Sequence, residues 1–431
     1  MKIAMLTNNY RPFVGGVPIS VERQAQELVK LGHQVTVFAP MYESDGPDQA
    51  EEFRERMMAE DRKSPERVIR YQSQKKKMDN GMVYPGIWPA EIFDVFERER
   101  FDCIHVHHPM FVGPWALLLG RKYKIPVVYT YHTRYEDYLH YIPCFRITQR
   151  STAVKRKAVE WIQKKVIPAY MGWFCNRCDL VLAPSAGMQQ MIRGYGVDTP
   201  AAILPTGLDG EFFTKDAGKS QEIRAEYGQG KKHLLVTVSR LEKEKNYGFL
   251  LRGIAEIEKL LGDDFHVLII GDGSQKSELK VRASILGIQD KVTFAGNVPN
   301  SQVKHYLGAS DLFLFASRSE TQGIVLAEAL AAGTPVVAVH AVGTDDIIED
   351  GVNGFLTEER EEAWAAKAVE ALCEENLGKM RSAALISAEN YRASRLAIHE
   401  EMLYNQCGLR KGDRAYETEE DRRKRSAMAL H

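Results

Sequence analysis

Short apolar runs alternate with segments of helical periodicity along the first half of the chain. The apolar runs lie at residues 2–8, 33–40, 101–108, 126–132, 178–185 and 201–209. The segment 16–32 repeats apolar side chains at helical spacing and stops at Gly32, so it is expected to form a helix. Strands that are apolar on both faces are typical of parallel sheets covered by helices. The first half therefore predicts a doubly wound α/β domain.

The same alternation starts again after a polar stretch at residues 211–232. Further strands are expected at 233–241, 265–273, 291–298, 311–317 and 335–341, with helices at 246–262, 276–287 and 301–310. We therefore predict two Rossmann-like domains of the α/β class, each with a doubly wound parallel sheet. The N-terminal domain is expected at residues 1–207, completed by a C-terminal helix at about 391–405, and the second domain at 208–390.

Two charged segments stand apart from this pattern. Residues 41–81 are expected to form a flexible, solvent-exposed excursion, because the segment is long and rich in charge. A helical stretch near 382–405 is followed by the charged residues 411–431, which are expected to be disordered.

Composition limits the classes of partner. The 431 residues carry a net charge of −1, which gives no overall attraction to nucleic acid, so an anion-binding or membrane-binding surface must be local. The six cysteines are scattered and do not indicate a disulfide framework. Cys175 and Cys178 form a CxxC sequence without a second pair, so packing is favoured over metal or redox use. No secretory signal or membrane-spanning helix is expected, which favours the cytoplasm.

Candidate ligand-binding residues follow several predicted strands, where parallel sheets usually bind ligands. Gly15 and Gly16 open a helix and would let the backbone approach an anion, although a tight turn explains them equally well. Arg240 and Lys245 flank a later strand-to-helix turn and suit a pyrophosphate; the alternative is an exposed basic turn balanced by nearby glutamates. Gly271 ends the next strand, where a nucleotide could approach the backbone.

The stretch "SRSETQGIVLAEALAAGTPVVA" places Glu320 after a strand and Glu328 inside the following helix. A carboxylate accepts paired hydrogen bonds from vicinal hydroxyls, so these side chains suit a sugar and a ribose. The backbone N–H groups of the intervening turn are expected to point toward the ligand; its residues are Thr321, Gln322, Gly323 and Ile324. The alternative is a helix cap together with a surface glutamate.

These features together resemble the GT-B glycosyltransferases of family 4, retaining enzymes that use nucleotide sugars. The resemblance covers about residues 1–405 and rests on the Gly15–Gly16 loop, His132, the 239–246 and 271–273 segments, and the two glutamates. It implies two domains facing across a cleft and a hexosyltransferase that needs neither metal nor cofactor. Same-face substitution, with the leaving phosphate helping to take the acceptor proton, is implied in the same way.

The resemblance also implies a role for each matching residue. Arg240 and Lys245 would hold the pyrophosphate and stabilise the leaving group. Glu320 would contact the donor sugar, Glu328 the ribose, and His132 would lie by the reacting sugar. One departure is "AVGTDDIIEDGVNGFL", which has a single glycine where many family members have two. Donor contacts at that place are therefore open, and the paired aspartates there could cap a helix.

Two strings indicate the acceptor. Residues 129–143, "YTYHTRYEDYLHYIP", are similar to bacterial diacylglycerol glucosyltransferases, and the dense tyrosines, Tyr135 and Tyr138 among them, suit an interface that is apolar at one end and wet at the other. The alternative is a packed loop. Residues 146–174 hold seven cations, one acid and several apolar side chains, which favours binding to anionic lipid over a solvated helix face. The residues expected at this surface also include Arg150, Lys155, Arg156, Lys157, Trp161, Lys164 and Lys165.

The sequence thus predicts transfer of an α-glucosyl unit from UDP-glucose to diacylglycerol at the inner face of the membrane, with UDP-galactose nearly as compatible. One alternative is a soluble family 4 transferase that acts on a sugar or sugar phosphate. A second is a nucleotide-sugar epimerase of the same fold, and a third is a binding module without activity. His105 and His107 alternate on a strand and share a face, which suits the core or the cleft better than zinc.

Overall fold

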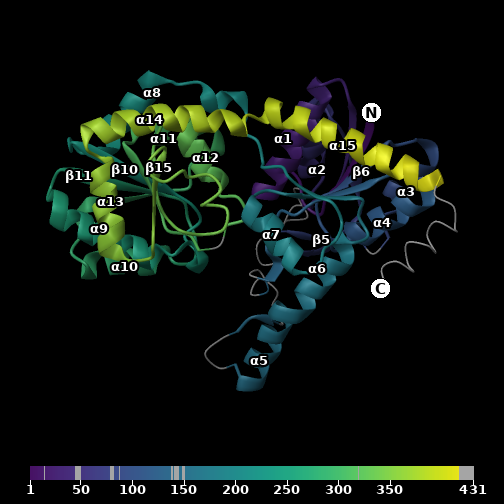
Figure 1. Cartoon of the computed structure of the whole chain (residues 1–431), viewed down its shortest axis with the longest axis horizontal. Coiled ribbons are helices and arrows are strands. Elements are labelled where there is room, and N and C mark those ends of the chain that lie inside the picture. The colour runs from purple at the N-terminus through teal and green to yellow at the C-terminus, as the bar shows by residue number, and fades with distance from the viewer. Residues whose placement is uncertain are drawn as a thin grey trace, which may run out of the picture. The chain divides into compact units, whose positions relative to one another are not determined.

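The computed structural model describes residues 1–13, 15–43, 50–77, 82–86, 88–136, 139, 145–147, 151–318 and 320–416, without the side chains of 75–77 and 409–416. The chain forms two compact units, coloured in Figure 1 by position along the sequence. Unit 1 holds Met1–Pro184, Gln189–Leu204 and the chain from Leu396 onward. Unit 2 holds Ser185–Met188 and Pro205–Arg395. We describe each unit separately.

The sheet of unit 1 is parallel throughout its described strands, in the order β3-β2-β1-β6-β7-β8-β9. The strands are β1 Lys2–Leu6, β2 Gln34–Pro40, β3 Arg67–Tyr71, β6 Cys103–Val106, β7 Val127–Thr130, β8 Leu180–Ala183 and β9 Ala201–Ile203. A separate hairpin pairs β4 Ser73–Lys77 with β5 Val83–Pro85. Because β1 lies at the centre between β2 and β6, the order reverses there, and a reversal of this kind is where doubly wound sheets place ligands.

Unit 1 also contains helices, most of which pack on this sheet. They are α1 Gly16–Lys30, α2 Ala50–Lys63, α3 Ala90–Arg98, α4 Val112–Tyr123, α5 Ala153–Trp161, α6 Ile167–Cys175, α7 Ala186–Gly194 and α15 Ala393–Tyr416, with a π-helical turn, η4 Ile162–Val166, between α5 and α6. One core cluster joins strand residues to Val21 and Leu28 of α1 and to Leu403 and Tyr404 of α15. The C-terminal helix therefore completes the hydrophobic core of unit 1.

Unit 2 contains a second parallel sheet, in the order β12-β11-β10-β13-β14-β15. Its strands are β10 His233–Val238, β11 Phe265–Ile270, β12 Val292–Gly296, β13 Leu312–Phe315, β14 Val336–Val339 and β15 Gly354–Thr357. Its helices are α8 Ala217–Tyr227, α9 Tyr247–Leu261, α10 Lys276–Ile285, α11 Asn300–Ala309, α12 Ile324–Ala331, α13 Glu361–Ala371 and α14 Glu374–Ala388; short turns are η5 Gly210–Phe213, η6 Lys243–Lys245, η7 Gln289–Lys291 and η8 Glu389–Tyr391. Two apolar clusters cover its two faces. The predicted fold class, two doubly wound parallel-sheet domains, is confirmed.

The expectation of a flexible excursion at residues 41–81 is wrong for the residues that the structure describes. This segment forms α2, then β3 at the edge of the sheet beside β2, then the β4–β5 hairpin. Arg70 donates to both carboxylate oxygens of Asp61 at 2.8 Å and to the carbonyl of Pro40 at 3.0 Å, and both charged side chains are buried. High charge favours a solvated segment, but part of this charge is paired inside the fold. Residues 44–49 and 78–81 lie outside the described residues.

The expected C-terminal helix also differs in its bounds. The stretch near 382–405 is divided between α14, which ends at Ala388, and α15, which begins at Ala393. The backbone of residues 411–416 belongs to α15, so the disorder expected from residue 411 onward is wrong there. Residues 417–431 lie outside the described residues.

Replacing Asp61 by Ala should destabilise the protein by about 3–5 kcal/mol, because removal of one partner from a buried ion pair leaves an uncompensated charge. Urea unfolding followed by circular dichroism measures this. Glu52→Ala, on the exposed face of the same helix, is the matched control and should change stability by less than about 0.5 kcal/mol. Equal stability of the two variants would show that the Arg70–Asp61 pair does not hold α2 against the sheet.

Candidate active site

The carboxyl end of the unit 2 sheet brings together a lysine and a glutamate that are far apart in sequence. Lys245 lies in η6 after β10, and Glu320 follows the neighbouring strand β13. Lys245 Nζ lies 2.5 Å from Glu320 Oε1, and the two side chains are only 15% and 14% exposed. Arg240, after the same strand, is about half exposed, and its Nη2 lies 3.1 Å from Glu244 Oε1. Two cations and a carboxylate thus follow two adjacent strands, as the sequence led us to expect.

The glycine at the end of β11 is required by a close backbone approach. Gly271 has φ +130°, and a Cβ atom there would lie 1.9 Å from the carbonyl oxygen of Ser239. Leu241 N donates to the carbonyl of Asp272 at 2.9 Å, which joins the loops after β10 and β11. The close packing of the two loops explains why residue 271 is a glycine. Because glycine has no side chain, the backbone of this turn is also left uncovered at that position.

The turn between the two glutamates is held by contacts within unit 2. Gln322 accepts from the backbone N–H of Thr206 at 2.6 Å and donates to its carbonyl at 3.0 Å. The carbonyl of Thr321 accepts from Ser185 Oγ at 2.9 Å. Gly323 has φ +75° and precedes Ile324, the first residue of α12. Because the amide of Gln322 is used in this way, a ligand at this turn would meet backbone N–H groups rather than that side chain.

Glu328 is a buried residue, 7% exposed, on α12. Its helical neighbours Leu326, Ala327, Ala329 and Leu330 are buried as well. The alternative interpretation of this residue as a surface glutamate is therefore wrong.

The single glycine that departs from the family pattern packs against the same turn. Gly343 has φ +81°, and a Cβ atom there would lie 3.0 Å from backbone atoms of Thr321 and Gln322. The neighbouring Asp346 accepts from the N–H groups of Ala186 at 2.9 Å and Gly187 at 3.3 Å. One of the paired aspartates thus caps a helix, as considered from the sequence, and the helix is α7, which begins at Ala186.

The candidate catalytic residue of unit 1, His132, lies in a cluster of histidines at the carboxyl ends of β6 and β7. His107 Nδ1 lies 2.9 Å from His132 Nε2. The rings of His105 and His107 lie 4.1 Å apart between centroids, which confirms that they share a face. Burial, and next the neighbouring histidines, lower the pKa of His107 and of His132 well below the usual range. Burial lowers the pKa of His108 to about 3. These imidazoles are therefore neutral at neutral pH.

The described residues contain no group of three or more His, Cys, Asp or Glu side chains arranged to hold a metal ion. His105 is fully buried, and its ring nitrogens contact Thr130 Oγ1 at 2.6 Å and the Tyr404 hydroxyl at 2.7 Å. Cys175 and Cys178 are buried free thiols, and burial raises the pKa of each. These residues fit the packing roles that the sequence favoured.

The loop after β1 leads directly into α1. Gly16 is the first residue of this helix, and Gly15 precedes it with φ 180°, an extended conformation that any residue adopts. Upstream, Arg11 lies 2.5 Å from Glu22 and 2.9 Å from the buried Glu66. Ion pairs therefore anchor the loop to α1 and to the segment before β3. A Cβ atom built at Gly16 would meet nothing within 4 Å, and this open space is consistent with a close approach of a ligand.

Part of the tyrosine-rich segment at residues 129–143 belongs to the hydrophobic core. Tyr129 and Tyr131 are fully buried, and Tyr129 packs edge-on against Phe174 at 5.1 Å between ring centroids. These two tyrosines do not form an interface, because β7 and the residue that follows it lie inside the sheet layer. Tyr135 is partly buried, and burial raises its pKa. Tyr138 and Arg150 lie outside the described residues.

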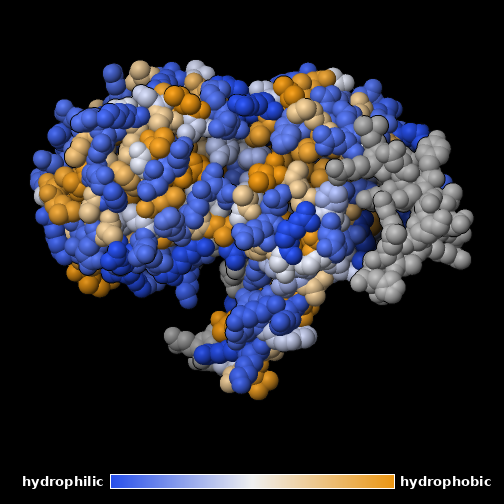
Figure 2. All heavy atoms as spheres, in the orientation of Figure 1, coloured by the Kyte–Doolittle hydropathy of each residue, from blue (hydrophilic) through white to orange (hydrophobic). Residues whose placement is uncertain are grey.

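The basic segment forms a helical projection that Figure 1 draws extending from the strands of unit 1 through α6, η4 and α5. Val154 is 77% exposed and Trp161 is 61% exposed. The cations along it are at least partly exposed: Lys155, Arg156, Lys157, Lys164 and Lys165. Figure 2 shows hydrophilic and hydrophobic atoms side by side on this projection. Among the described residues, none of the helices combines the length and hydropathy that a membrane span requires.

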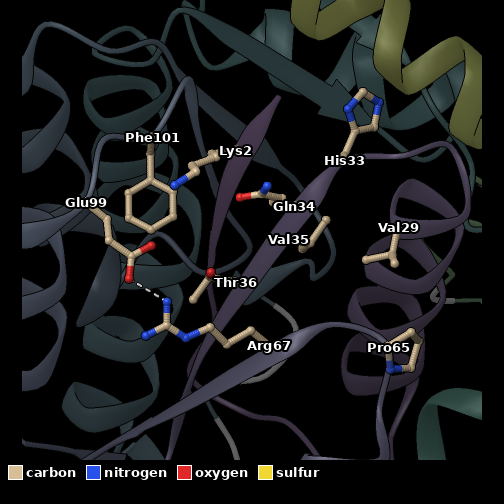
Figure 3. Close-up of a pocket in the computed structure, with 10 residues that line it drawn as sticks. All are labelled: Lys2, Val29, His33, Gln34, Val35, Thr36, Pro65, Arg67, Glu99 and Phe101. Atoms are coloured by element: carbon tan, nitrogen blue, oxygen red, sulfur yellow. Dashed lines mark hydrogen bonds and ion pairs between the residues drawn. The ribbon is translucent and has the colours of Figure 1, made fainter.

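A pocket of about 370 Å³ lies elsewhere in unit 1 (Figure 3). It is lined by Lys2, Gln34 and Arg67, the first residues of β1, β2 and β3, among others. Arg67 is paired with Glu99 at 2.5 Å. This pocket opens at the amino ends of the strands, whereas the candidate residues of unit 1 follow their carboxyl ends. It therefore adds nothing to the predicted site.

Residues 14–212 match the model for Glycosyltransferase Family 4, and residues 219–390 match the model for Glycosyl transferases group 1. The chain is 30% identical over 362 residues to an alpha-monoglucosyldiacylglycerol synthase of Streptococcus pneumoniae, covering 83% of this chain and 75% of the relative. This chain belongs to the family 4 glycosyltransferases. A second alpha-monoglucosyldiacylglycerol synthase, of Acholeplasma laidlawii, is 27% identical, with 84% of this chain and 86% of the relative covered.

Solved glycosyltransferase structures share the fold. Anabaena HepE in complex with UDP and glucose aligns with a TM-score of 0.68 at 18% identity, over 94% of this chain and 100% of that chain. WaaG, a glycosyltransferase involved in lipopolysaccharide biosynthesis, aligns with a TM-score of 0.63 at 18% identity, over 92% and 98%. At these identities the likeness concerns the fold, and it confirms the GT-B class for this family 4 glycosyltransferase.

Stability should fall as the pH drops below the usual histidine range. Unfolded histidines titrate near pH 6.5, whereas burial keeps His108 neutral down to about pH 3. Between these values the unfolded chain binds more protons, so acid favours unfolding. His108→Asn keeps an acceptor for the backbone N–H of Asn8 and removes this titration. Between pH 6.5 and 5.5 the wild type should lose on the order of 1 kcal/mol more unfolding free energy than the variant, and equal losses in urea unfolding would contradict the assignment.

Proposed function

We propose that this glycosyltransferase transfers an α-glucosyl unit from UDP-glucose to the hydroxyl of diacylglycerol and so makes a membrane glycolipid. The observation that carries the proposal is the exposed basic and aromatic projection of unit 1, in a chain whose relatives include two alpha-monoglucosyldiacylglycerol synthases. A transferase with a water-soluble acceptor has no evident need for such a surface. UDP-galactose fits the same donor residues, and competition between the two sugar nucleotides decides between them.

The donor proposal starts from the lysine–glutamate pair. Lys245 and Arg240 supply positive charge for the pyrophosphate, and Glu320 is placed beside Lys245 to accept hydrogen bonds from sugar hydroxyls. Glu328, buried on α12, is assigned to the ribose hydroxyls. We propose that the two cations stabilise the leaving phosphate directly, so that no metal or cofactor is required.

We further propose that the reaction retains the anomeric configuration. The bond between the anomeric carbon and the phosphate oxygen breaks, and a bond to the diacylglycerol oxygen forms on the same face. The proton of the acceptor hydroxyl passes to the leaving phosphate, so UDP departs and charge balances. Lys245 and Arg240 would stabilise the negative charge that develops on that phosphate.

The acceptor proposal depends on α5 and η4. Lys157, Lys164 and Lys165 are exposed near Trp161, which is mostly exposed. Lysines attract anionic lipid headgroups, and tryptophan suits the boundary between headgroups and acyl chains. Residues 154, 158, 161 and 165 follow one another at spacings of four, three and four, which places them along one stripe of the helix. The projection would therefore hold the enzyme on the cytoplasmic face of the membrane, where its acceptor lies.

Lys245→Ala should lower turnover about 100-fold or more, since loss of one preorganised charge at a developing anion is worth roughly that much. Radiolabelled UDP-glucose and diacylglycerol in mixed vesicles provide the assay. Lys259→Ala, an exposed lysine on α9 that is paired with Glu256, is the matched control and should keep wild-type turnover. Unchanged turnover in Lys245→Ala would remove the pyrophosphate assignment.

Replacing Lys157, Lys164 and Lys165 together by Gln should weaken binding to vesicles that contain phosphatidylglycerol by roughly 100-fold, from about 1 kcal/mol for each lysine. Vesicle sedimentation measures the binding. The control replaces three exposed lysines of unit 2, Lys259, Lys367 and Lys379, and should bind as the wild type does. Glycosyl transfer to a water-soluble sugar, with no dependence on vesicles, would favour the soluble alternative. Interconversion of the donor without an acceptor would favour the epimerase.

A further inference from the structure

His132 has a buried histidine neighbour, His107, to which the proposed function assigns no role. His107 comes directly after β6 and is fully buried, and its Nδ1 lies 2.9 Å from Nε2 of His132. The two rings are nearly parallel, with an interplanar angle of 27° and 5.2 Å between centroids. His132 is the candidate catalytic residue of unit 1, so a part-buried hydrogen bond to one of its ring nitrogens constrains both its orientation and its proton.

The proton positions follow from burial and geometry. Burial and the surrounding histidines lower the pKa of both residues well below the usual range, so each ring carries a single proton. One N–H must lie between the two facing nitrogens for a hydrogen bond to form. The other nitrogen of His107, Nε2, is buried without a hydrogen-bond partner among the described residues. A buried N–H without an acceptor costs more than a bare lone pair, so the proton of His107 belongs on Nδ1.

The remaining histidines do not provide another arrangement. Both ring nitrogens of His105 have other partners: Nε2 contacts Thr130, and Nδ1 contacts Tyr404 and lies 3.3 Å from Glu400 Oε1. Its ring meets His107 in a tilted ring contact, with an interplanar angle of 36°. Nδ1 of His108 faces the backbone N–H of Asn8 at 3.1 Å. A backbone N–H can only donate, so Nδ1 of His108 holds a lone pair and cannot donate to His107.

We propose that His107 is a positioning residue: its Nδ1–H donates to Nε2 of His132, fixes that ring and leaves the proton of His132 on Nδ1. Which nitrogen of an imidazole carries the proton is set by the hydrogen bond that the other nitrogen makes. His132 then meets its surroundings as a hydrogen-bond donor through Nδ1, and its Nε2 lone pair is occupied and unable to accept a substrate proton. The protonation pattern stands on the contacts together with the burial of the rings, whatever the reaction; its effect on turnover rests on the proposed function.

Nitrogen-15 NMR of the histidine-labelled protein tests the pattern without any substrate. The His132 resonances are assigned by their loss in His132→Gln. We expect Nδ1 of His132 to be protonated and Nε2 to be bare in the wild type, and the same pattern in His107→Asn, whose amide nitrogen takes the place of Nδ1. In His107→Leu the Nε2-protonated form should appear. Protonated Nε2 in the wild type, or no change in His107→Leu, would overturn the proposal, whatever the reaction turns out to be.

Kinetics test the consequence for turnover. His107→Leu should lower kcat about 10- to 100-fold, the range of a moderate contribution to positioning, with little change in KM for UDP-glucose. His107→Asn should recover most of that loss. His266→Leu, which removes a buried histidine from β11 in unit 2, is the matched control and should leave kcat unchanged. If His107→Asn is as slow as His107→Leu while the NMR pattern of His132 is kept, the positioning role is refuted and the proposed function is not.

Discussion

The parallel arrangement of the strands is the constraint on which the candidate residues of each unit depend. In a parallel sheet all strands end on the same side, so the residues that follow successive strands gather at the carboxyl end of the sheet. In unit 2, β10 and β13 are neighbours although their residues are far apart in sequence, and Lys245 and Glu320 meet at 2.5 Å for that reason. In unit 1, β6 and β7 are neighbours, and His107 and His132 meet in the same way.

Burial decides what these polar groups can do. A carboxylate such as Glu328 or a pair such as Arg70 and Asp61 is costly inside a protein unless its hydrogen bonds are satisfied. The Arg70–Asp61 pair meets this requirement and ties a charged segment into the sheet. The histidine cluster meets it differently: desolvation keeps the rings neutral, so they act as hydrogen-bonding groups rather than charges.

In the basic projection, by contrast, the charged side chains stay exposed to solvent. Its lysines and Trp161 remain exposed, although the same sequence places Val159 and Ile167 against the rest of the unit. Val154 and Trp161 are the most exposed large apolar side chains of this projection, and their burial against another apolar phase would be favourable. The family likeness accounts for the fold of the two units, whereas the proposed lipid acceptor rests on this local surface.

The sequence by itself determined the α/β class, most strands and helices, and the positions that follow the strands, because apolar periodicity and glycine breaks are local signals. Periodicity could not show that residues 41–81 contain a strand of the sheet, since Arg70 and Asp61 read as solvated charges until their pairing is seen. Nor could it show that Gln322 is held by Thr206, that Glu328 is buried, or that Tyr129 belongs to the core. Only the tertiary structure decided which histidine faces which, because a hydrogen bond between residues that follow two strands depends on how those strands are paired in the sheet.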